Sequence, residues 1–151
     1  MKERIERSAV YKIQPALYKS LVGLGEAAAA GLEPSLVHLV KLRASQINGC
    51  AFCQHRHANE ARKDGEKQSR LDVLPSWREV PVFSARERAA LEWTEAATRL
   101  PQGSPTDEQF AQLRQVLSQE EIVNLTITIA VINAWNRIAV GFNFFPDFKD
   151  L

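Results

Sequence analysis

The stretch LVKLRASQINGCAFCQHRHANEARKDGE, residues 39–66, contains both cysteines of the chain and two of its three histidines. On a helix, which turns about 100° per residue, Cys50, Cys53 and His57 fall within roughly 60° of one another and share one face. Two Cα atoms three residues apart on a helix are about 5 Å distant, which is inside the usual range for a disulfide. The sequence therefore predicts a pair of thiols that can form and break a disulfide without a change in the helix.

The start of this helix favours a thiolate. Asn48 and Gly49 form a turn signal, which places both cysteines in the first helical turn. Unpaired backbone N–H groups and the helix dipole stabilise an anion there. His57 follows Cys53 by one turn, where it can accept the thiol proton or, when charged, lower the thiol pKa further. The pattern supplies a nucleophile, a base and a second thiol that can resolve an adduct.

Helix signals dominate the rest of the chain, and no convincing strand alternation is present. Three capping boxes predict helices over about 85–100, 107–117 and 119–140. These boxes are Ser84 with Glu87, Thr106 with Gln109, and Ser118 with Glu121. Further helices are predicted from Pro15 to Gly31, from Ser35, after an opening Pro34, to about Ile47, and from Cys50 to Gly65, with a short helix and an irregular connection over 66–83. The expected fold is all-α, a compact multi-helix arrangement with one domain over residues 1–151.

Residues 122–140 carry apolar side chains on nearly every face when they are placed on a helix. This pattern predicts burial on all sides, either in the core or between subunits, and so indicates symmetric self-association. Four polar residues interrupt the run, so we expect a buried helix rather than a membrane span. They are Asn124, Asn133, Asn136 and Arg137.

Composition narrows the function classes. The chain has 151 residues, 45% of them hydrophobic and 25% charged, with a formal net charge of +1, as in ordinary globular domains. No basic stripe with interleaved aromatic residues is present, so nucleic-acid binding has little support. Residues 1–13 lack the apolar run of a signal peptide, and we therefore expect a cytoplasmic protein. In a reducing compartment a close cysteine pair is more often catalytic or metal-binding than structural.

The segment CAFCQHRH, which follows KLRASQING, resembles the Cys-x-x-Cys-x-x-x-His core of the alkylhydroperoxidase D-like (AhpD-like) family, within the carboxymuconolactone decarboxylase superfamily. The resemblance continues through GEKQSRLDVLPSWRE, FSARERAALEWTEAAT and INAWNRIAV, so it covers most of the chain. It implies an all-α AhpD-like fold, assembled into homotrimers or homohexamers. It also implies an antioxidant oxidoreductase that reduces hydroperoxides, and we expect no metal or other cofactor.

The resemblance implies a role for each residue of this core. Cys53 attacks the hydroperoxide and becomes a sulfenic acid, and Cys50 condenses with it to a disulfide with release of water. An external dithiol, on a thioredoxin-like or lipoyl protein, then restores both thiols. His57 matches the family histidine that helps to deprotonate the cysteines.

One position departs from the family pattern: a glutamate commonly lies twelve residues before the first cysteine, where this chain has His38. His38 lies on the same helical side as Lys41, so it can face the site as a relay residue or serve as a hydrogen-bonded structural histidine. A histidine passes protons near neutral pH but supplies no fixed negative charge to orient His57. We therefore expect weaker or differently pH-dependent peroxidase activity.

The residues leave several alternatives open. A zinc site has four possible ligands in the two cysteines, His57 and either His55 or His38, although three ligands from one helix face strain tetrahedral geometry. The thiol pair could also serve a dithiol–disulfide oxidoreductase with a substrate other than peroxide, or the chain could be a non-catalytic oligomeric protein that binds a ligand. The helix dipole favours Cys50 as the attacking thiol, whereas the family resemblance favours Cys53.

Overall fold

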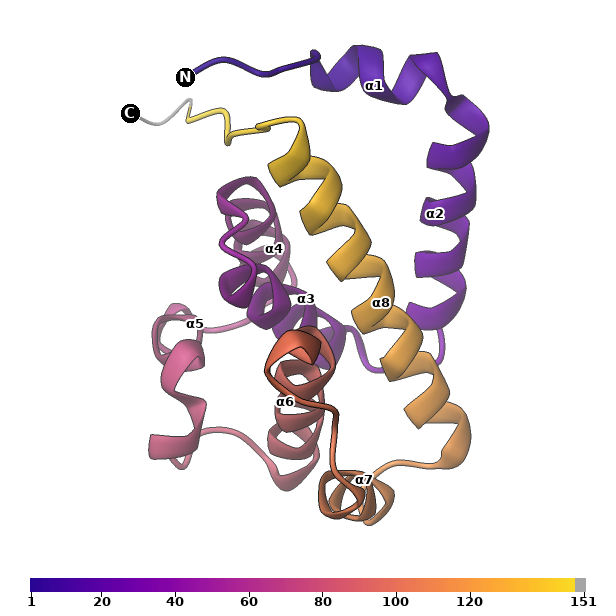
Figure 1. Ribbon diagram of the computed structural model, residues 1–151. Helices are drawn as coiled ribbons and strands as arrows, with labels where there is room; N and C mark the ends of the chain where they lie inside the picture. Colours follow the sequence, from indigo (N-terminus) through magenta and orange to yellow (C-terminus); the bar gives the residue numbers. More distant parts are fainter. Residues whose placement is uncertain (149–151) are drawn as a thin grey trace.

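Eight α-helices and two 3₁₀ segments make up the part of the chain that the computed structural model describes, residues 1–148 (Figure 1). In chain order they are α1 (Arg7–Ile13), α2 (Pro15–Ala29), α3 (Pro34–Ile47), α4 (Ala51–Lys63), α5 (Gln68–Val73), η1 (Leu74–Glu79), α6 (Ala85–Thr98), η2 (Leu100–Gln102), α7 (Asp107–Arg114) and α8 (Gln119–Gly141). No strand occurs within these residues, so the prediction of an all-α fold is confirmed. α3 lies at the centre, where it packs against α4, α6 and α8.

The helix starts follow from the local sequence. All three predicted capping boxes form, because the side chains of Ser84, Thr106 and Ser118 each accept a hydrogen bond from the backbone N–H three residues on, and the side chain at that position bonds back. Pro15 and Pro34 begin α2 and α3, since a proline there lacks only an N–H that has no partner in the helix. α1 lies outside the predicted set, because its N-cap residue, Glu6, makes no side-chain capping hydrogen bond and no proline begins the helix.

Two apolar clusters meet at α3. One lies between α3, α6, α7 and α8 and buries Val40, Leu113 and Leu125 completely. The other lies between α3, α4, α6 and the segment from α5 to η1, and it buries Leu39 and Leu74 completely. Each buried leucine contributes roughly 1.5–3 kcal/mol relative to an exposed one, so α3 is fixed from both sides.

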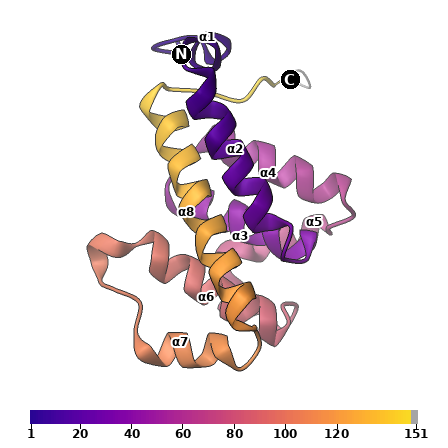
Figure 2. The same cartoon turned by 90° about the vertical axis from the view of Figure 1, so that its right-hand side faces the viewer.

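α8 is buried along one side only within this chain. Its inner side, with Leu125 and Ile132, is almost fully buried, whereas its outer side leaves Val123 61% exposed and Val140 50% exposed. Burial on every face therefore does not occur in the single chain, because the neighbouring helices cover only part of the circumference of α8 (Figure 2). Within residues 1–148, α8 is the one helix whose length and composition would allow it to cross a membrane. Core helices of soluble proteins often have the same length and composition, so this is weak evidence for a membrane span.

A buried ionic cluster around Glu95 ties α3, α6 and η1 together. Glu95 is 4% exposed, and one of its carboxylate oxygens accepts hydrogen bonds from Arg43 Nε at 2.8 Å and Trp77 Nε1 at 3.0 Å. Arg78 and Arg99 donate to the other oxygen at 2.7 and 3.2 Å. Burial raises the pKa of Glu95, but the hydrogen bonds from Arg78, Trp77 and Arg43 outweigh it and hold the pKa below the ordinary value. Arg43 is itself buried and depends on Glu95 for its counter-charge.

We expect Glu95→Gln to lower the free energy of unfolding by about 3–5 kcal/mol, because the neutral amide leaves the buried Arg43 charge unpaired. Urea denaturation at pH 7 measures this loss. Glu92→Gln is the matched control, since Glu92 pairs with the half-exposed Arg78 and its loss should cost less than about 1 kcal/mol. Equal losses in the two variants would show that the buried cluster contributes no more than a surface charge pair.

Candidate active site

Cys50 ends one helix and begins the next. At the end of α3, the Cys50 N–H donates to Ser45 O at 3.0 Å, and the Gly49 N–H donates to Gln46 O at 3.2 Å. This pairing requires a left-handed residue, which Gly49 supplies with a φ of 64°. Cys50 is then the N-cap of α4, where its Sγ accepts a hydrogen bond from the Cys53 N–H at 3.2 Å. The turn that the sequence predicts before the cysteine helix is therefore confirmed.

Cys50 and Cys53 form a disulfide, with their Cα atoms 5.3 Å apart, so the pair closes on the helix as the sequence predicts. The two sulfurs have different surroundings. Both cysteines belong to an apolar cluster with Ala139 and Phe144, in which Cys50 is 1% exposed. Cys53 is 4% exposed, but it lines a cavity of about 280 Å³ between α2, α4 and α8, whereas Cys50 does not. Of the two cysteines, a molecule in this cavity therefore meets Cys53.

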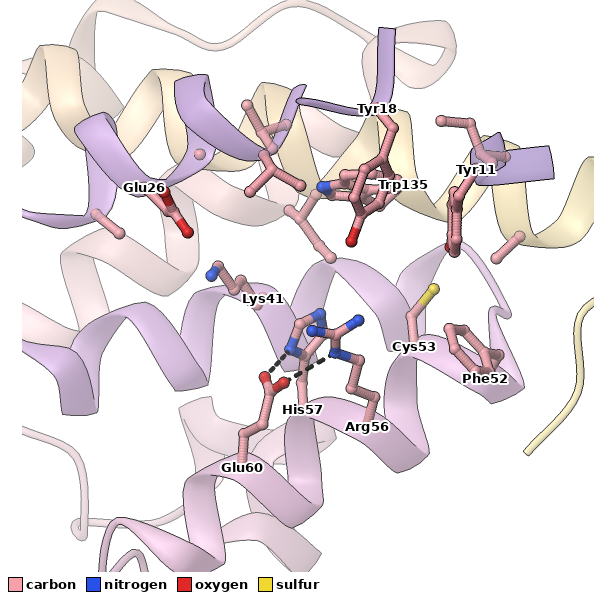
Figure 3. Close-up of a pocket in the computed structure, with 17 residues that line it drawn as sticks. Tyr11, Tyr18, Glu26, Lys41, Phe52, Cys53, Arg56, His57, Glu60 and Trp135 are labelled. Carbon is pink, nitrogen blue, oxygen red and sulfur yellow. Dashed lines mark hydrogen bonds and ion pairs between the residues drawn. The ribbon is translucent and has the colours of Figure 1, made fainter. Parts of the chain in front are cut away.

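His57 lies one turn beyond Cys53 on α4 and lines the same cavity (Figure 3). Its Nδ1 lies 2.8 Å from Glu60 Oε2. An ionised carboxylate only accepts, so Nδ1 carries the proton and Nε2 keeps its lone pair. Figure 3 shows this second nitrogen turned toward the cavity. Burial lowers the pKa of His57, against the hydrogen bond and charge of Glu60, so the neutral imidazole predominates at pH 7.

Glu60 provides a fixed negative charge beside His57. Partial burial raises the pKa of Glu60, but hydrogen bonds from His57 and from Arg56 Nε, each at 2.8 Å, outweigh burial and lower the pKa to about 2. Each carboxylate oxygen is occupied by one of these partners. Glu60 is not among the residues predicted from the sequence. The signal that reveals it is the His-x-x-Glu spacing, since side chains three residues apart meet on a helix.

His38 does not join this site. Its Nε2 lies 2.6 Å from Asp64 Oδ2, and both side chains line a separate hollow. The reason is the antiparallel register of α3 and α4, because His38 lies about 15 Å along α3 from the turn and so reaches the far end of α4. Lys41 lies one helical turn closer to the α3–α4 connection, and it lines the cavity with His57 instead. The relay role of His38 stays a prediction, without a direct contact to the cavity that supports it.

The four ligands of a zinc site are not gathered in one place. The His55 ring bonds to the Asn59 amide at 2.9 Å and contacts the Phe148 ring, so it points away from the cysteine face. Neither His55 nor His38 lines the cavity with Cys53. Across residues 1–148, no group of three or more His, Cys, Asp or Glu side chains is arranged to hold a metal ion.

We expect Glu60→Gln to lower the pKa of His57 further, because the carboxylate raises that pKa through its hydrogen bond and its charge. Protonation of His57 then requires a lower pH than in the wild type. NMR titration of the imidazole protons measures the change, with His55 of the same protein as an internal control. A His57 pKa that stays unchanged or rises would show that Glu60 does not act on the imidazole.

Comparison with known proteins supports a family assignment. Residues 15–96 match the model of the carboxymuconolactone decarboxylase family. The uncharacterized protein YdfG of Bacillus subtilis (strain 168) is 35% identical over 137 residues, which span 90% of this chain and 93% of that protein. A protein of unknown function from Agrobacterium tumefaciens, ATU0492, which has been suggested to be the antioxidant defence protein AhpD, is 42% identical and has a TM-score of 0.90, over 97% of this chain and 99% of that one.

The debrominase Bmp8 has a TM-score of 0.79 at 20% identity, over 87% of this chain and 72% of that one, which shows a shared fold. The family match covers more than half of the chain, and the Bacillus subtilis relative is matched over nearly its whole length. Both findings agree with the cysteine and histidine pattern on α4. The chain therefore belongs to the carboxymuconolactone decarboxylase family.

Proposed function

We propose that the chain is a thiol-dependent peroxidase of the alkylhydroperoxidase kind, which reduces hydroperoxides through Cys50 and Cys53. The observation that carries this proposal is the position of Cys53 on the cavity wall, beside a neutral His57 whose Nε2 is available to take a proton. The antioxidant role suggested for the Agrobacterium tumefaciens protein, at 42% identity, supports the same assignment.

The residues of the site can perform each step. His57 Nε2 takes the proton of the Cys53 thiol, and the Glu60 carboxylate stabilises the imidazolium. The Cys53 thiolate attacks the terminal oxygen of ROOH, so the O–O bond breaks, Cys53 becomes a sulfenic acid, and the alkoxide takes the proton from His57 and leaves as an alcohol. Cys50 then attacks the Cys53 sulfur, which forms the disulfide and releases water. An external dithiol, on a thioredoxin-like or lipoyl protein, is oxidised as it restores both thiols.

Cys50 is suited to the second step rather than the first. It lies outside the cavity wall, so a peroxide in the cavity meets Cys53 before it. The hydrogen bond from the Cys53 N–H to Cys50 Sγ favours a thiolate at Cys50, which makes it a better resolving nucleophile. Access thus favours Cys53 as the attacking thiol, in agreement with the family resemblance and against the helix-dipole argument for Cys50.

A dithiol–disulfide oxidoreductase with another substrate would use the same groups. The debrominase Bmp8 shares the fold, so the fold by itself does not select peroxide as the substrate. Direct measurement of peroxide consumption separates these two functions.

We expect the dithiol-reduced protein to consume one organic hydroperoxide for every two thiols lost. Cys53→Ser should consume none, and Cys50→Ser should consume one and stop at the sulfenic acid, because no second thiol resolves it. His57→Ala should slow consumption by about 10²–10⁴. Peroxide loss followed together with free-thiol counts measures each effect. Wild-type protein that keeps both thiols in the presence of peroxide would reject the peroxidase.

We also propose that the chain works in the cytoplasm as a homo-oligomer, the trimer or hexamer that the family resemblance implies. The exposed apolar residues Val123 and Val140 support an interface, since they lie on the outer side of α8. Light scattering at low concentration is expected to give a multiple of 17.0 kDa. A species at 17.0 kDa alone would contradict the assembly.

A further inference from the structure

Lys41 is an unpaired cation on the cavity wall. Its side chain extends from α3 into the space between Glu26 and His57 (Figure 3). It is half-buried, and burial lowers its pKa. The Lys41 ammonium makes no hydrogen bond or ion pair with any residue in the described part of the chain. A half-buried charge without a partner is costly, so a ligand that pairs with it gains affinity.

The acidic groups of the cavity do not neutralise Lys41 by contact. The charge of Glu60 raises the pKa of Lys41, but both Glu60 oxygens are already held, by His57 Nδ1 and by Arg56 Nε. Arg56 also lines the cavity, and its Nε already pairs with the Glu60 carboxylate. Glu26 is exposed on α2 and also lines the cavity (Figure 3), and it forms no ion pair with Lys41 within residues 1–148. Among the described residues, Lys41 is therefore the cation of the cavity wall that no carboxylate contacts.

The rest of the site is mostly apolar and extends beyond the cavity. Tyr11, Tyr18 and Trp135 form an aromatic wall, with ring centroids 4.4 Å apart for the two tyrosines and 5.7 Å apart for Tyr18 and Trp135. The same three residues line a groove of about 370 Å³ between α1, α2 and α8. Ile13 and Leu17 in this groove are 64% and 68% exposed. The aromatic wall thus borders both the cavity and the groove.

We propose that this site binds an amphiphilic anion, with a carboxylate paired to the Lys41 ammonium and an apolar body that passes the aromatic wall into the groove. The substrate assignment rests on the proposed function, in which the ligand is an organic hydroperoxide that carries a carboxylate and Cys53 attacks its peroxide oxygen. The binding assignment does not depend on that chemistry. The groove shares Tyr11, Tyr18 and Trp135 with the cavity, and the cavity holds the unpaired Lys41 cation, which favours a ligand over a second copy of the chain as the occupant.

Calorimetric titration of the oxidised protein with dodecanoate tests the binding directly, because this form holds the disulfide and does not turn over. Dodecyltrimethylammonium has the same chain and the opposite charge, and both probes are used below their micelle-forming concentrations. We expect dodecanoate to bind at least about tenfold more tightly than the cation. Lys41→Met keeps most of the length of the side chain and removes the charge, so it should weaken dodecanoate binding by about tenfold or more. Lys41→Arg should restore most of the affinity.

Lys67→Met is the matched control, because it removes the same charge from an exposed position before α5, outside the cavity. It should leave the affinity for dodecanoate within about twofold. Circular dichroism with thermal unfolding verifies that each variant folds. Absence of wild-type binding, equal affinity of Lys41→Met, or equal binding of the two amphiphiles would overturn the proposal. An affinity that does not rise from butanoate to dodecanoate would also overturn it, and would leave the groove to another occupant such as a second copy.

Two hydroperoxides separate this proposal from the proposed function. Cumene hydroperoxide and its para-carboxylate differ only in the anionic group, so the wild type should use the carboxylate with a kcat/KM about tenfold higher, and Lys41→Met should lose that preference. Turnover of neither compound, together with Lys41-dependent binding of dodecanoate, would reject the peroxidase and keep the anion site. Equal turnover of both, without binding of dodecanoate, would keep the peroxidase and reject the anion site.

Discussion

The Asn48 side chain holds the cysteine-bearing turn against α8. Its amide donates to Asn136 Oδ1 at 2.8 Å and to Asn133 Oδ1 at 3.0 Å, and the Asn136 amide donates to Ser45 Oγ at 3.0 Å. Asn136 is 1% exposed, so a change of register between α3 and α8 would leave buried amides unsatisfied. The cavity lies between α4 and α8, and the place of Cys53 in its wall therefore depends on this network.

The register of α3 against α4 distributes the charges of the site. The two helices run antiparallel from the turn, so side chains at equal distances from it face each other. Lys41 reaches the level of His57 and Glu60, whereas His38 reaches Asp64 at the far end of α4. The carboxylate that fixes the His57 tautomer consequently comes from α4 itself, three residues on, and not from α3. Glu60 thus supplies the fixed negative charge that a histidine at position 38 cannot.

Local signals make most of this fold predictable. Capping boxes, helix-opening prolines and helix-ending glycines act within a few residues, and each helix start that they predict is present. The relative position of the two cysteines also depends only on their spacing along the chain, and the disulfide confirms their pairing. The partner of His38 and the exposed side of α8 depend on which helices lie alongside, which periodicity along one helix does not encode. Glu60 could have been predicted from the sequence as well, because its contact with His57 spans a single helical turn.

Cys50 and Cys53 differ because they lie one helical turn apart. The helix N-terminus stabilises a thiolate at Cys50, whereas the cavity is open to Cys53. The N-terminus of α4 acts on Cys50, whose sulfur accepts a hydrogen bond from the Cys53 N–H, but Cys50 is 1% exposed and does not line the cavity. Cys53 lacks that hydrogen bond and instead lines the cavity with His57. In a bimolecular reaction contact comes first, since a thiolate that the substrate cannot reach contributes no rate. A stabilised thiolate at Cys50 contributes in the second step, when Cys53 is a sulfenic acid and its sulfur lies within disulfide distance of Cys50. The proposed cycle requires this order of events.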